Sequence, residues 1–243
     1  MKISPKVIAV MPAYNAAKTL QKTINDIPPG VVSQIILVDD HSSDDTAQLA
    51  KKLKIEVIQH PQNRGYGGNQ KTCYTMALSQ GADVVVMIHP DYQYDSSLTK
   101  EMVQPILDGK VDLMLGSRIR SRAESLAGGM PLYKYIGNRF LTLVENMLLG
   151  QNLSEYHTGF RAYSKELLAS LPFHKYSDDF VFDSQLIFGA IAQGARIGEI
   201  RVPVRYFEEA SSINFKRSTI YGLSILWDLG RYLLSGGKAF INH

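Results

Sequence analysis

Short apolar runs alternate with amphipathic segments along the first half of the chain. The apolar runs fall at 7–11, 34–38, 55–58, 83–88 and 111–115. The amphipathic segments between them are 16–27, 68–80 and 98–107. Ser42 and Ser43 are suited to capping a further helix. Asp44 and Asp45 would then lie in its first turn, where carboxylates favour the helix dipole. This alternation predicts an α/β fold in which helices flank a mostly parallel sheet.

The pattern of apolar and polar residues changes in the second half of the chain. Residues 121–130 are small and include Gly128 and Gly129, which favours a mobile lid. Residues 133–149 carry an apolar stripe with helical spacing, and such a stripe is more often core packing than a lipid groove. The stripe consists of Ile136, Phe140, Leu143, Val144 and Met147. A helix over 179–193 and a strand over 197–204 complete the pattern.

The C-terminal tail is predicted to form one or two amphipathic helices. Its apolar part, 220–234, is interrupted by Asp228 and Arg231. This part is shorter than the ~20 residues of a bilayer span, so we expect it to lie on a membrane without crossing it. Because no internal repeat or low-complexity linker divides the chain, we expect one domain over 1–215 and a helical appendage over 216–243.

Composition narrows the class of protein. The 243 residues are 45% hydrophobic and 20% charged, which is typical of a globular protein. A net charge of +3 without a long basic run argues against a nucleic-acid-binding protein. Cys73 is the single cysteine, so no internal disulfide is expected, and a buried position is favoured. The apolar run at 7–11 is too short for a signal peptide, which predicts a cytoplasmic location.

Basic side chains gather after the last of the apolar runs. They are Arg118, Arg120, Arg122, Lys134 and Arg139. Such a cluster would suit phosphate or an anionic membrane surface, and a solvated basic face is equally compatible with it.

Polar residues stand where the predicted strands end. They are Asn15, Asp39, Asp40, Asp91 and Arg118. Taken alone, Asp91 could simply open a turn after Pro90. Because the carboxyl ends of parallel strands meet at one edge of a sheet, however, we expect all five to converge there on a ligand.

Four segments at this edge carry more specific patterns. They read Met-Pro-Ala-Tyr-Asn at 11–15, Val-Asp-Asp-His-Ser-Ser-Asp-Asp-Thr at 38–46, Asn-Arg-Gly-Tyr-Gly-Gly-Asn-Gln-Lys at 63–71 and Ile-His-Pro-Asp-Tyr-Gln at 88–93. Together they resemble the family 2 glycosyltransferases of the GT-A fold, especially the branch similar to dolichyl-phosphate mannose synthase. The resemblance covers about residues 7–216, and 38–46 is its most specific part.

The resemblance implies that the first two segments bind the base of a nucleotide. The turn that would receive the base consists of Pro12, Ala13, Tyr14 and Asn15. A strand-end carboxylate would hydrogen-bond the base; Asp40 is favoured, with Asp39 close behind. His41 stands where the family has a small residue, and Ala16 stands where it has a glutamate. Asn15 is also suited to capping a helix.

The third segment is implied to bind the diphosphate of the nucleotide. Glycine backbones and a helix N-terminus suit phosphate, although a glycine cluster alone is more often a tight turn. The residues expected at the phosphates are Arg64, Gly65, Lys71, Arg118 and Lys216, with Arg217 as the alternative to Lys216.

The fourth segment aligns with the family's Asp-x-Asp-x-Gln, which holds a divalent cation between the donor phosphates. Asp91 and Gln93 keep the ligand types of the family. His89 replaces the first aspartate, which predicts a weaker site that accepts Mn²⁺ more readily than Mg²⁺. His89 is placed both among the donor-binding residues and among the metal ligands, and the alternative is that it only hydrogen-bonds a carbonyl.

Two later segments, 156–163 and 180–185, also resemble the branch. Arg161 belongs to the first and is expected at the rim of the site, among the catalytic residues. Asp183 or Asp179 would act as general base toward a hydroxyl acceptor, and either could instead cap the helix that starts nearby. Gln185 stands where the branch has a glutamate.

The implied reaction is inverting transfer of a sugar from a UDP- or GDP-sugar. The acceptor is either a polyprenyl phosphate, such as dolichyl or undecaprenyl phosphate, or a hydroxyl of a soluble compound or glycan. The basic stretch and the tail favour the lipid phosphate, at the inner face of the membrane.

The departures at Ala16, His89 and Gln185 leave open a nucleotide-sugar-binding protein with weakened catalysis. A Rossmann oxidoreductase is disfavoured, because no glycine fingerprint follows the first strand. A homodimer stays open.

Overall fold

One mixed sheet organises the protein. The computed structural model describes residues 4–119, 122–203 and 215–242. Within them, seven strands follow the order β3-β2-β1-β4-β6-β5-β7, and β6 alone runs antiparallel to its neighbours. The strands are β1 (Val7–Ala13), β2 (Gln34–Asp39), β3 (Glu56–Gln59), β4 (Val84–Met87), β5 (Leu113–Ser117), β6 (Arg161–Ser164) and β7 (Ile197–Arg201). The predicted α/β class with a mostly parallel sheet is confirmed.

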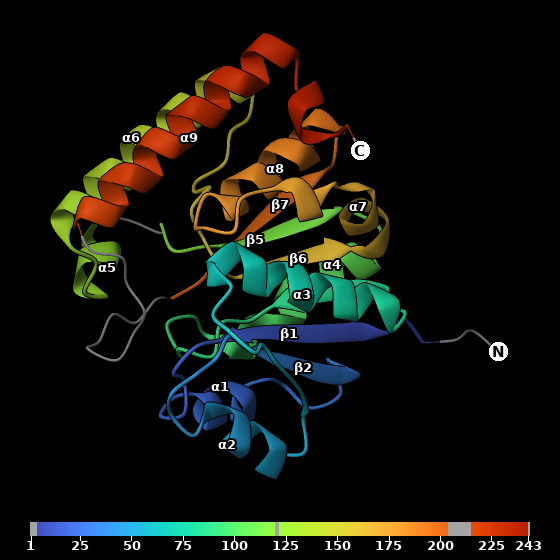
Figure 1. Ribbon diagram of the computed structural model, residues 1–243. Helices are drawn as coiled ribbons and strands as arrows, with labels where there is room; N and C mark the ends of the chain where they lie inside the picture. Colours follow the sequence, from blue (N-terminus) through green and yellow to red (C-terminus); the bar gives the residue numbers. More distant parts are fainter. Residues whose placement is uncertain (1–3, 120–121, 204–214, 243) are drawn as a thin grey trace.

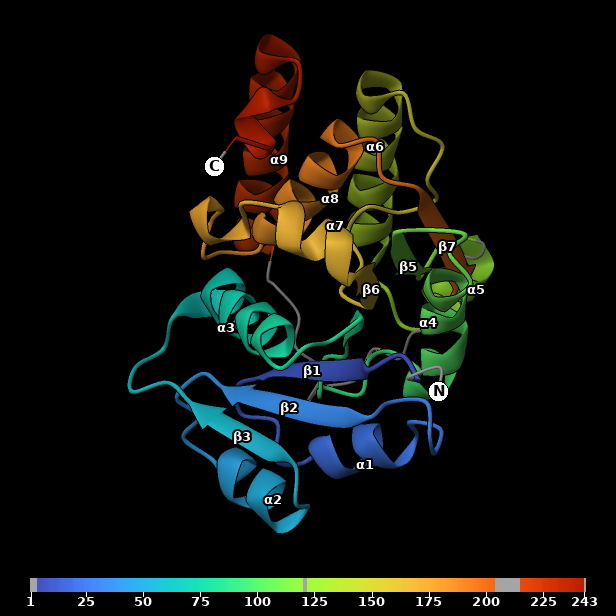
Figure 2. The ribbon, with the colours of Figure 1, turned by 90° about the vertical axis from the view of Figure 1, so that its right-hand side faces the viewer.

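Helices cover both faces of the sheet (Figures 1 and 2). They are α1 (Leu20–Asn25), α2 (Thr46–Lys52), α3 (Gly65–Ser79), α4 (Thr99–Leu107), α5 (Arg122–Ala127), α6 (Leu132–Leu149), α7 (Lys165–Ser170), α8 (Phe182–Ala192) and α9 (Phe215–Ser235), with short 3₁₀ turns at Ser96–Leu98, Phe173–Lys175 and Lys238–Phe240. One core lies between the sheet and α1, α2 and α4, and the other joins the sheet to α3, α7, α8 and α9. The two cores bury both faces of the central strands.

Strand β1 lies near the middle of the sheet, between β2 and β4. All seven of its residues are buried, which explains why its sequence is a continuous apolar run without polar alternation. The parallel register pairs Ala13 of β1 with Asp39 of β2. The two strands therefore end at the same level, and the turns that follow them lie side by side.

Several expectations about helix ends are wrong. Helix α1 begins at Leu20, four residues later than predicted, and α3 begins at Gly65, three residues earlier. Ser42 and Ser43 do not cap α2, which begins at Thr46. Residues 122–127, within the segment expected to be a lid, form α5. Ser121, at the start of that predicted lid, and Val204, at the end of the last predicted strand, lie outside the described residues.

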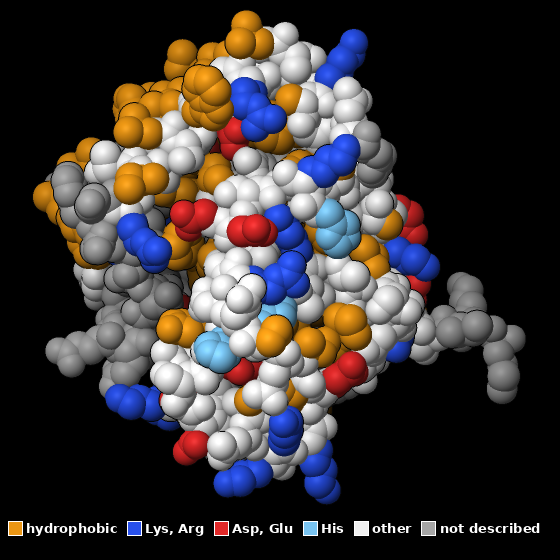
Figure 3. Space-filling model, in the orientation of Figure 1, with side chains coloured by type: hydrophobic (Ala, Val, Ile, Leu, Met, Phe, Trp, Pro, Cys, Tyr) orange, Lys and Arg blue, Asp and Glu red, His pale blue; other side chains and the backbone are white. Residues whose placement is uncertain are grey.

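The apolar stripe of α6 does not pack in the core, contrary to expectation. Ile136, Phe140, Leu143 and Met147 are exposed to 58%, 57%, 58% and 73%, and only Val144 packs against the core. The reason is that α6 turns its other side toward α9 and the cavity described below. Apolar side chains therefore gather on the surface over these two helices (Figure 3).

The C-terminal helix α9 packs beside α6 and against α8 (Figure 1). Ile225 and Leu229 of α9 and Phe240 after it lie in the same apolar core as α8. Among the described residues, no helix is long and apolar enough to span a bilayer.

Candidate active site

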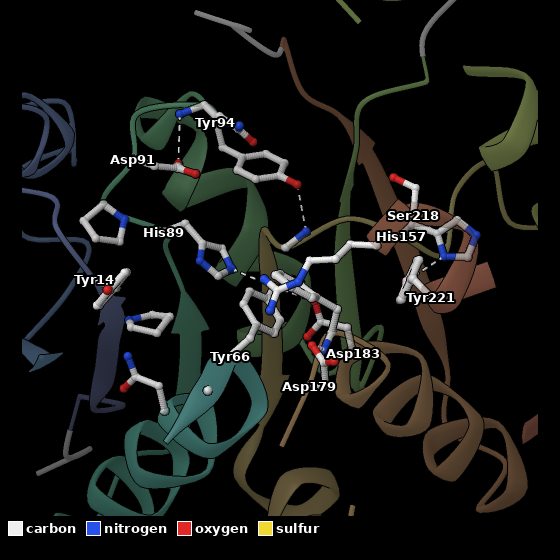
Figure 4. A pocket seen from close by; sticks show the side chains of 18 of the residues that line it. Tyr14, Tyr66, His89, Asp91, Tyr94, His157, Asp179, Asp183, Ser218 and Tyr221 are labelled. Carbon is white, nitrogen blue, oxygen red and sulfur yellow. Dashed lines mark hydrogen bonds between the residues drawn. The ribbon is translucent and has the colours of Figure 1, made fainter. Parts of the chain in front are cut away.

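A cavity of about 770 Å³ opens at the carboxyl ends of β1 and β4. Of the residues predicted from the sequence, those that line it are Pro12, Ala13, Tyr14, Asn15, Asp40, Gly65, His89, Asp91, Gln93, Arg118, Asp179 and Asp183 (Figure 4). We call the lining residues at 12–16, 40 and 89–94 the strand-end wall. The lining residues at 133–141 of α6 and 217–221 of α9 form the helical wall. Of the five strand-end residues expected to converge, Asn15, Asp40, Asp91 and Arg118 line this cavity, and Asp39 does not.

The turns of the strand-end wall hold unusual backbone conformations. Asn15, His41 and Tyr92 follow the adjacent strands β1, β2 and β4 and have φ angles of 52°, 64° and 61°. This left-handed region costs a non-glycine residue about 1–2 kcal/mol. The turns are held by cross-links: the Asn15 N–H donates to Ser42 Oγ, and the Ser43 N–H donates to Asn15 Oδ1, both at 2.9 Å. The wall is therefore fixed before any ligand binds.

The carboxylate of Asp40 is fully engaged. Its Oδ1 accepts from the Arg64 N–H at 2.8 Å and lies 2.7 Å from Nδ1 of His60, and its Oδ2 accepts from the Gly65 N–H at 3.1 Å. Asp40 thus orients the start of α3 and has little capacity left for a ligand.

Asp39 differs from its neighbour. It is buried, and its Oδ2 accepts from the Ser42 N–H at 3.3 Å. Its Oδ1 has no hydrogen-bond partner among the described residues. A buried carboxylate oxygen without a partner is rare in proteins, and a donor N–H on a ligand would satisfy it. Of the two carboxylates, Asp39 is the better acceptor for a base, although it does not itself line the cavity.

The glycine-rich start of α3 packs against the loop before α8. The Gly67 N–H donates to the Asp178 carbonyl at 2.7 Å, and a Cβ at Gly67 would lie 2.4 Å from the Ser177 carbonyl oxygen. The ammonium of Lys71 donates to Asp178 Oδ1 at 2.7 Å. Lys71 and Arg64 are consequently directed at protein groups and do not line the cavity. The glycines serve close packing here.

His89 belongs to a hydrogen-bonded chain that crosses the floor of the cavity (Figure 4). The Tyr66 hydroxyl donates to Asp183 Oδ2 at 2.7 Å and lies 3.2 Å from Nε2 of His89. Because the single hydroxyl proton goes to Asp183, Nε2 of His89 must carry the proton it shares with Tyr66. Burial lowers the pKa of His89, which keeps the ring neutral and leaves a lone pair on Nδ1.

Arg161 lies behind this chain and not at the rim. It is completely buried, and its guanidinium donates to the backbone carbonyls of Tyr156, Thr158 and Asp183. It also lies 3.7 Å from Asp183 Oδ2. Its contacts assign it to holding Asp183 in place.

The groups available to a divalent cation are Asp91 and His89. One oxygen of Asp91 accepts from the Gln93 N–H at 3.1 Å, and burial raises the pKa of the carboxyl. No described set of three or more His, Cys, Asp or Glu side chains could hold a metal alone. An imidazole lone pair and a carboxylate fit a cation whose remaining ligands come from substrate phosphates, as is usual for Mg²⁺ and Mn²⁺ at phosphate sites.

The helical wall and its surroundings are cationic. Arg118 lines the cavity and is paired with the buried carboxylate of Glu155, which also accepts from Asn138 of α6 at 2.8 Å. Burial raises the pKa of Glu155, but the charge and hydrogen bonds of Arg118 outweigh this and hold the pKa below its usual value. Lys134 and Arg217 also line this side. An anion would be favoured between them.

The sequence matches the model of glycosyl transferase family 2 over residues 8–171, which is more than half of the chain. The chain belongs to glycosyl transferase family 2. The resemblance expected from the sequence is thereby confirmed, and this glycosyltransferase uses a nucleotide sugar.

Relatives agree with this assignment. The chain is 29% identical over 219 residues to the UDP-N-acetylglucosamine–dolichyl-phosphate N-acetylglucosaminyltransferase of Methanococcus voltae, covering 83% of this chain and 86% of that protein. It is 24% identical over 214 residues to the undecaprenyl-phosphate mannosyltransferase of Micrococcus luteus, covering 84% of each. Glucosyl-3-phosphoglycerate synthase of Mycobacterium tuberculosis, solved with Mn²⁺, UDP and product, superposes with a TM-score of 0.70 at 20% identity, over 93% of this chain and 80% of that one. The GT-A fold is confirmed.

Sequence reasoning missed several residues of the glycosyltransferase cavity. They are Tyr66, Tyr94, Tyr133, Asn138, His157, Ser218 and Tyr221. Tyr66 stood in the glycine-rich segment, but its hydroxyl contacts could not be read from the sequence. His157 stood in the segment 156–163, but no role was assigned to it, and the remaining residues lie outside the segments that carry a motif. The predicted clamp Lys216 lies outside the described side chains, whereas its alternative Arg217 lines the cavity.

The contacts of Gln185 explain why an amide stands where the branch has a glutamate. Its amide nitrogen donates to the buried Asp228 at 2.7 Å, and its oxygen accepts from the Ser177 N–H at 2.7 Å. A glutamate there would place a second carboxylate against Asp228. An amide at this position therefore fits its local partners, Asp228 and Ser177.

Proposed function

We propose that the protein transfers a sugar, with inversion, from a UDP- or GDP-sugar to a polyprenyl phosphate at the inner face of the membrane. The donor lies on the strand-end wall, and the acceptor phosphate lies against the helical wall. Support comes from the relatives named for dolichyl phosphate and undecaprenyl phosphate and, above all, from the chemistry of the cavity.

The observation that carries the proposal is an excess of cations over available bases on the acceptor side. Asp183 accepts from Tyr66 at Oδ2 and from the Gln70 amide at Oδ1, so two protein side chains already hold this carboxylate in place. The helical side of the cavity instead presents Lys134 and Arg217. A hydroxyl acceptor needs a general base, whereas a phosphate is already ionised and needs only positioning by cations.

The residues then divide the work as follows. Asp39 accepts an N–H of the base, and the fixed turn at 12–15 receives the nucleoside. Arg118 and Arg217 stabilise charge on the phosphates. The acceptor oxygen attacks the anomeric carbon from the side opposite the leaving diphosphate. A divalent cation held by Asp91 and Nδ1 of His89, with Gln93 nearby, would neutralise negative charge on the leaving nucleoside diphosphate.

Asp179 offers a direct test, because it is the one predicted base that is exposed to the cavity and not saturated by side-chain donors. Transfer from radiolabelled nucleotide sugar to detergent-dispersed polyprenyl phosphate should change by less than about threefold in Asp179→Asn. With a hydroxyl acceptor, loss of a general base would cost about 10²- to 10⁴-fold. Asp45→Asn is the control, because Asp45 is an exposed residue directly before α2 and does not line the cavity. A hundredfold loss confined to Asp179→Asn, or transfer only to soluble hydroxyls, would refute the lipid-phosphate acceptor.

A further inference from the structure

Among the described residues, the two helices that close the cavity carry nearly all of the exposed large apolar side chains. On α6 and α9 these are Leu132, Tyr133, Ile136, Phe140, Leu143, Met147, Leu148, Ile220, Leu223, Leu226, Trp227, Leu233 and Leu234. We call this set the α6–α9 face. Among the described residues, Tyr14 is the one exposed large hydrophobic side chain outside it. So concentrated a patch marks an interaction surface.

The exposed side chains form two stripes on neighbouring helices. Ile136, Phe140, Leu143 and Met147 follow the i, i+4, i+7, i+11 spacing of one helical side. On α9 the most exposed side chains are Trp227 at 73% and Leu234 at 92%. The helices lie side by side in both ribbon views, so the stripes combine into one surface (Figures 1 and 2).

Charge on these helices is distributed with one sign. Glu145 and Asp228, the carboxylates of the two helices, are buried at 0% and 3% exposure. Glu145 faces His157, and Asp228 accepts from Gln185. The exposed charged side chains described on the two helices are arginines, Arg139, Arg217 and Arg231, with Lys134 partly exposed; Arg231 is paired with the buried Asp228 at 2.9 Å. The surface therefore combines apolar stripes with cations and shows no exposed carboxylate among its described side chains.

The combination of apolar stripes and cations indicates which kind of partner binds the α6–α9 face. A second copy docked through the same face would bring arginines against arginines, because a two-fold interface is self-complementary. An anionic lipid surface offers acyl chains to the apolar stripes and negative headgroups to the cations. The face is also continuous with the cavity, since Tyr133 belongs to both.

We infer that the α6–α9 face docks on an anionic lipid surface and places the mouth of the cavity at the membrane. The inference deepens the proposed function, because it explains how a lipid-linked acceptor reaches the helical wall. Binding to lipid itself requires neither donor nor acceptor.

The single tryptophan of the chain makes the test direct, because Trp227 lies on this face. The full-length protein is mixed with vesicles of phosphatidylcholine containing phosphatidylglycerol, without polyprenyl phosphate. Trp227 emission should shift to shorter wavelength, and the protein should co-sediment with the vesicles. Added salt should weaken binding without abolishing it, since only the cationic part is screened.

Phe140→Asp combined with Leu143→Asp should weaken vesicle binding by about a hundredfold or more. The control combines Gln21→Asp with Gln48→Asp, which adds the same charge at exposed positions of α1 and α2 and should bind within about threefold of wild type. Thermal unfolding of both double variants verifies that they are folded.

Three results would overturn the inference: no binding to any vesicle, binding that the α6 double variant leaves unchanged, or a dimer in sedimentation velocity that this variant abolishes. Transfer to detergent-dispersed polyprenyl phosphate separates these from failure of the proposed function. If the protein transfers sugar in detergent but does not bind vesicles, the proposed function stands and the docking inference is refuted.

Discussion

The strand-end wall and the helical wall of the cavity are built by opposite means. In the strand-end wall, three turns at the ends of buried strands contain left-handed residues, and hydrogen bonds through Asn15 and Ser42 link the turns after β1 and β2. In the helical wall, α6 and α9 present polar side chains inward and apolar side chains outward. Rigidity suits a nucleotide that must be oriented, whereas an amphipathic helix pair suits a substrate with a polar head and an apolar tail. Substitutions in either wall can test this difference.

The largest effect is expected at Asp91 of the strand-end wall. Asp91→Asn should lower kcat/KM with Mn²⁺ by at least about a hundredfold, because the neutral amide removes the negative charge that binds and neutralises the cation. The metal-free variant should unfold about 2–4 °C higher than wild type, since burial raises the pKa of Asp91 and its ionised form therefore opposes folding at neutral pH. Kinetics and calorimetry measure the two quantities.

The sign of this stability gain can be checked with pH. As the pH falls through the raised pKa of Asp91, wild type becomes neutral there and the difference in Tm should shrink. Asp45→Asn should change neither quantity. A variant that loses both activity and stability would show that Asp91 serves the fold.

A smaller effect is expected at Gly159, which packs against His89 of the strand-end wall. A Cβ there would lie 2.7 Å from Cδ2 and Nε2 of His89, so Gly159→Ala must displace the ring and break its contact with Tyr66. Affinity for Mn²⁺ in the presence of UDP, measured by calorimetry, should fall about 10- to 100-fold. Gly230→Ala on α9 is the control, because Gly230 does not line the cavity and its Cβ would meet nothing within 4 Å.

The same measurement has a predicted pH dependence. Because burial lowers the pKa of His89 below its ordinary 6.5, Mn²⁺ affinity should hold from pH 7.5 to pH 6.5 and decline only in more acidic solution. Unchanged affinity in Gly159→Ala would show that His89 is not a ligand.

The helical wall should respond differently. Lys134→Gln should raise the KM for polyprenyl phosphate about tenfold and leave the KM for the nucleotide sugar within about twofold. Burial and then Arg118 lower the pKa of Lys134, so wild type should lose acceptor affinity as alkaline pH approaches that lowered value. Lys100→Gln on α4 is the control. Equal changes in both KM values would mean that the two walls do not bind different substrates.

The two walls also differ in how far the sequence predicted them. The strand-end wall was predicted well because a buried strand followed by a polar turn is a local signal, and the ends of adjacent parallel strands must meet. Even there, the choice between Asp39 and Asp40 depended on backbone donors at Arg64 and Gly65. Those donors come from a turn distant in the sequence, so no local pattern could reveal them.

The helical wall was predicted poorly for a physical reason. The spacing of Ile136, Phe140, Leu143 and Met147 correctly indicated an amphipathic helix. Spacing alone cannot tell an apolar side that meets the core from one that meets lipid or a partner. For the C-terminal tail, too, the sequence did not show whether Trp227 faces the core or the outside. Only the packing of α6 on α9 decided which side of each helix faces outward.

The smallest effect concerns the strain of the strand-end wall. His41 is exposed and has φ near 64°, a conformation that glycine adopts without a Cβ penalty. His41→Gly should raise Tm by about 1–3 °C, because relief of strain exceeds the added entropy of the unfolded chain, and activity should stay within about twofold. His41→Ala keeps the Cβ and should gain nothing. Asn15→Gly should instead lower Tm, since Asn15 Oδ1 accepts the Ser43 N–H. If His41→Ala stabilises as much as His41→Gly, the imidazole and not the backbone is the source of strain, and the turn after β2 is less rigid than the wall requires.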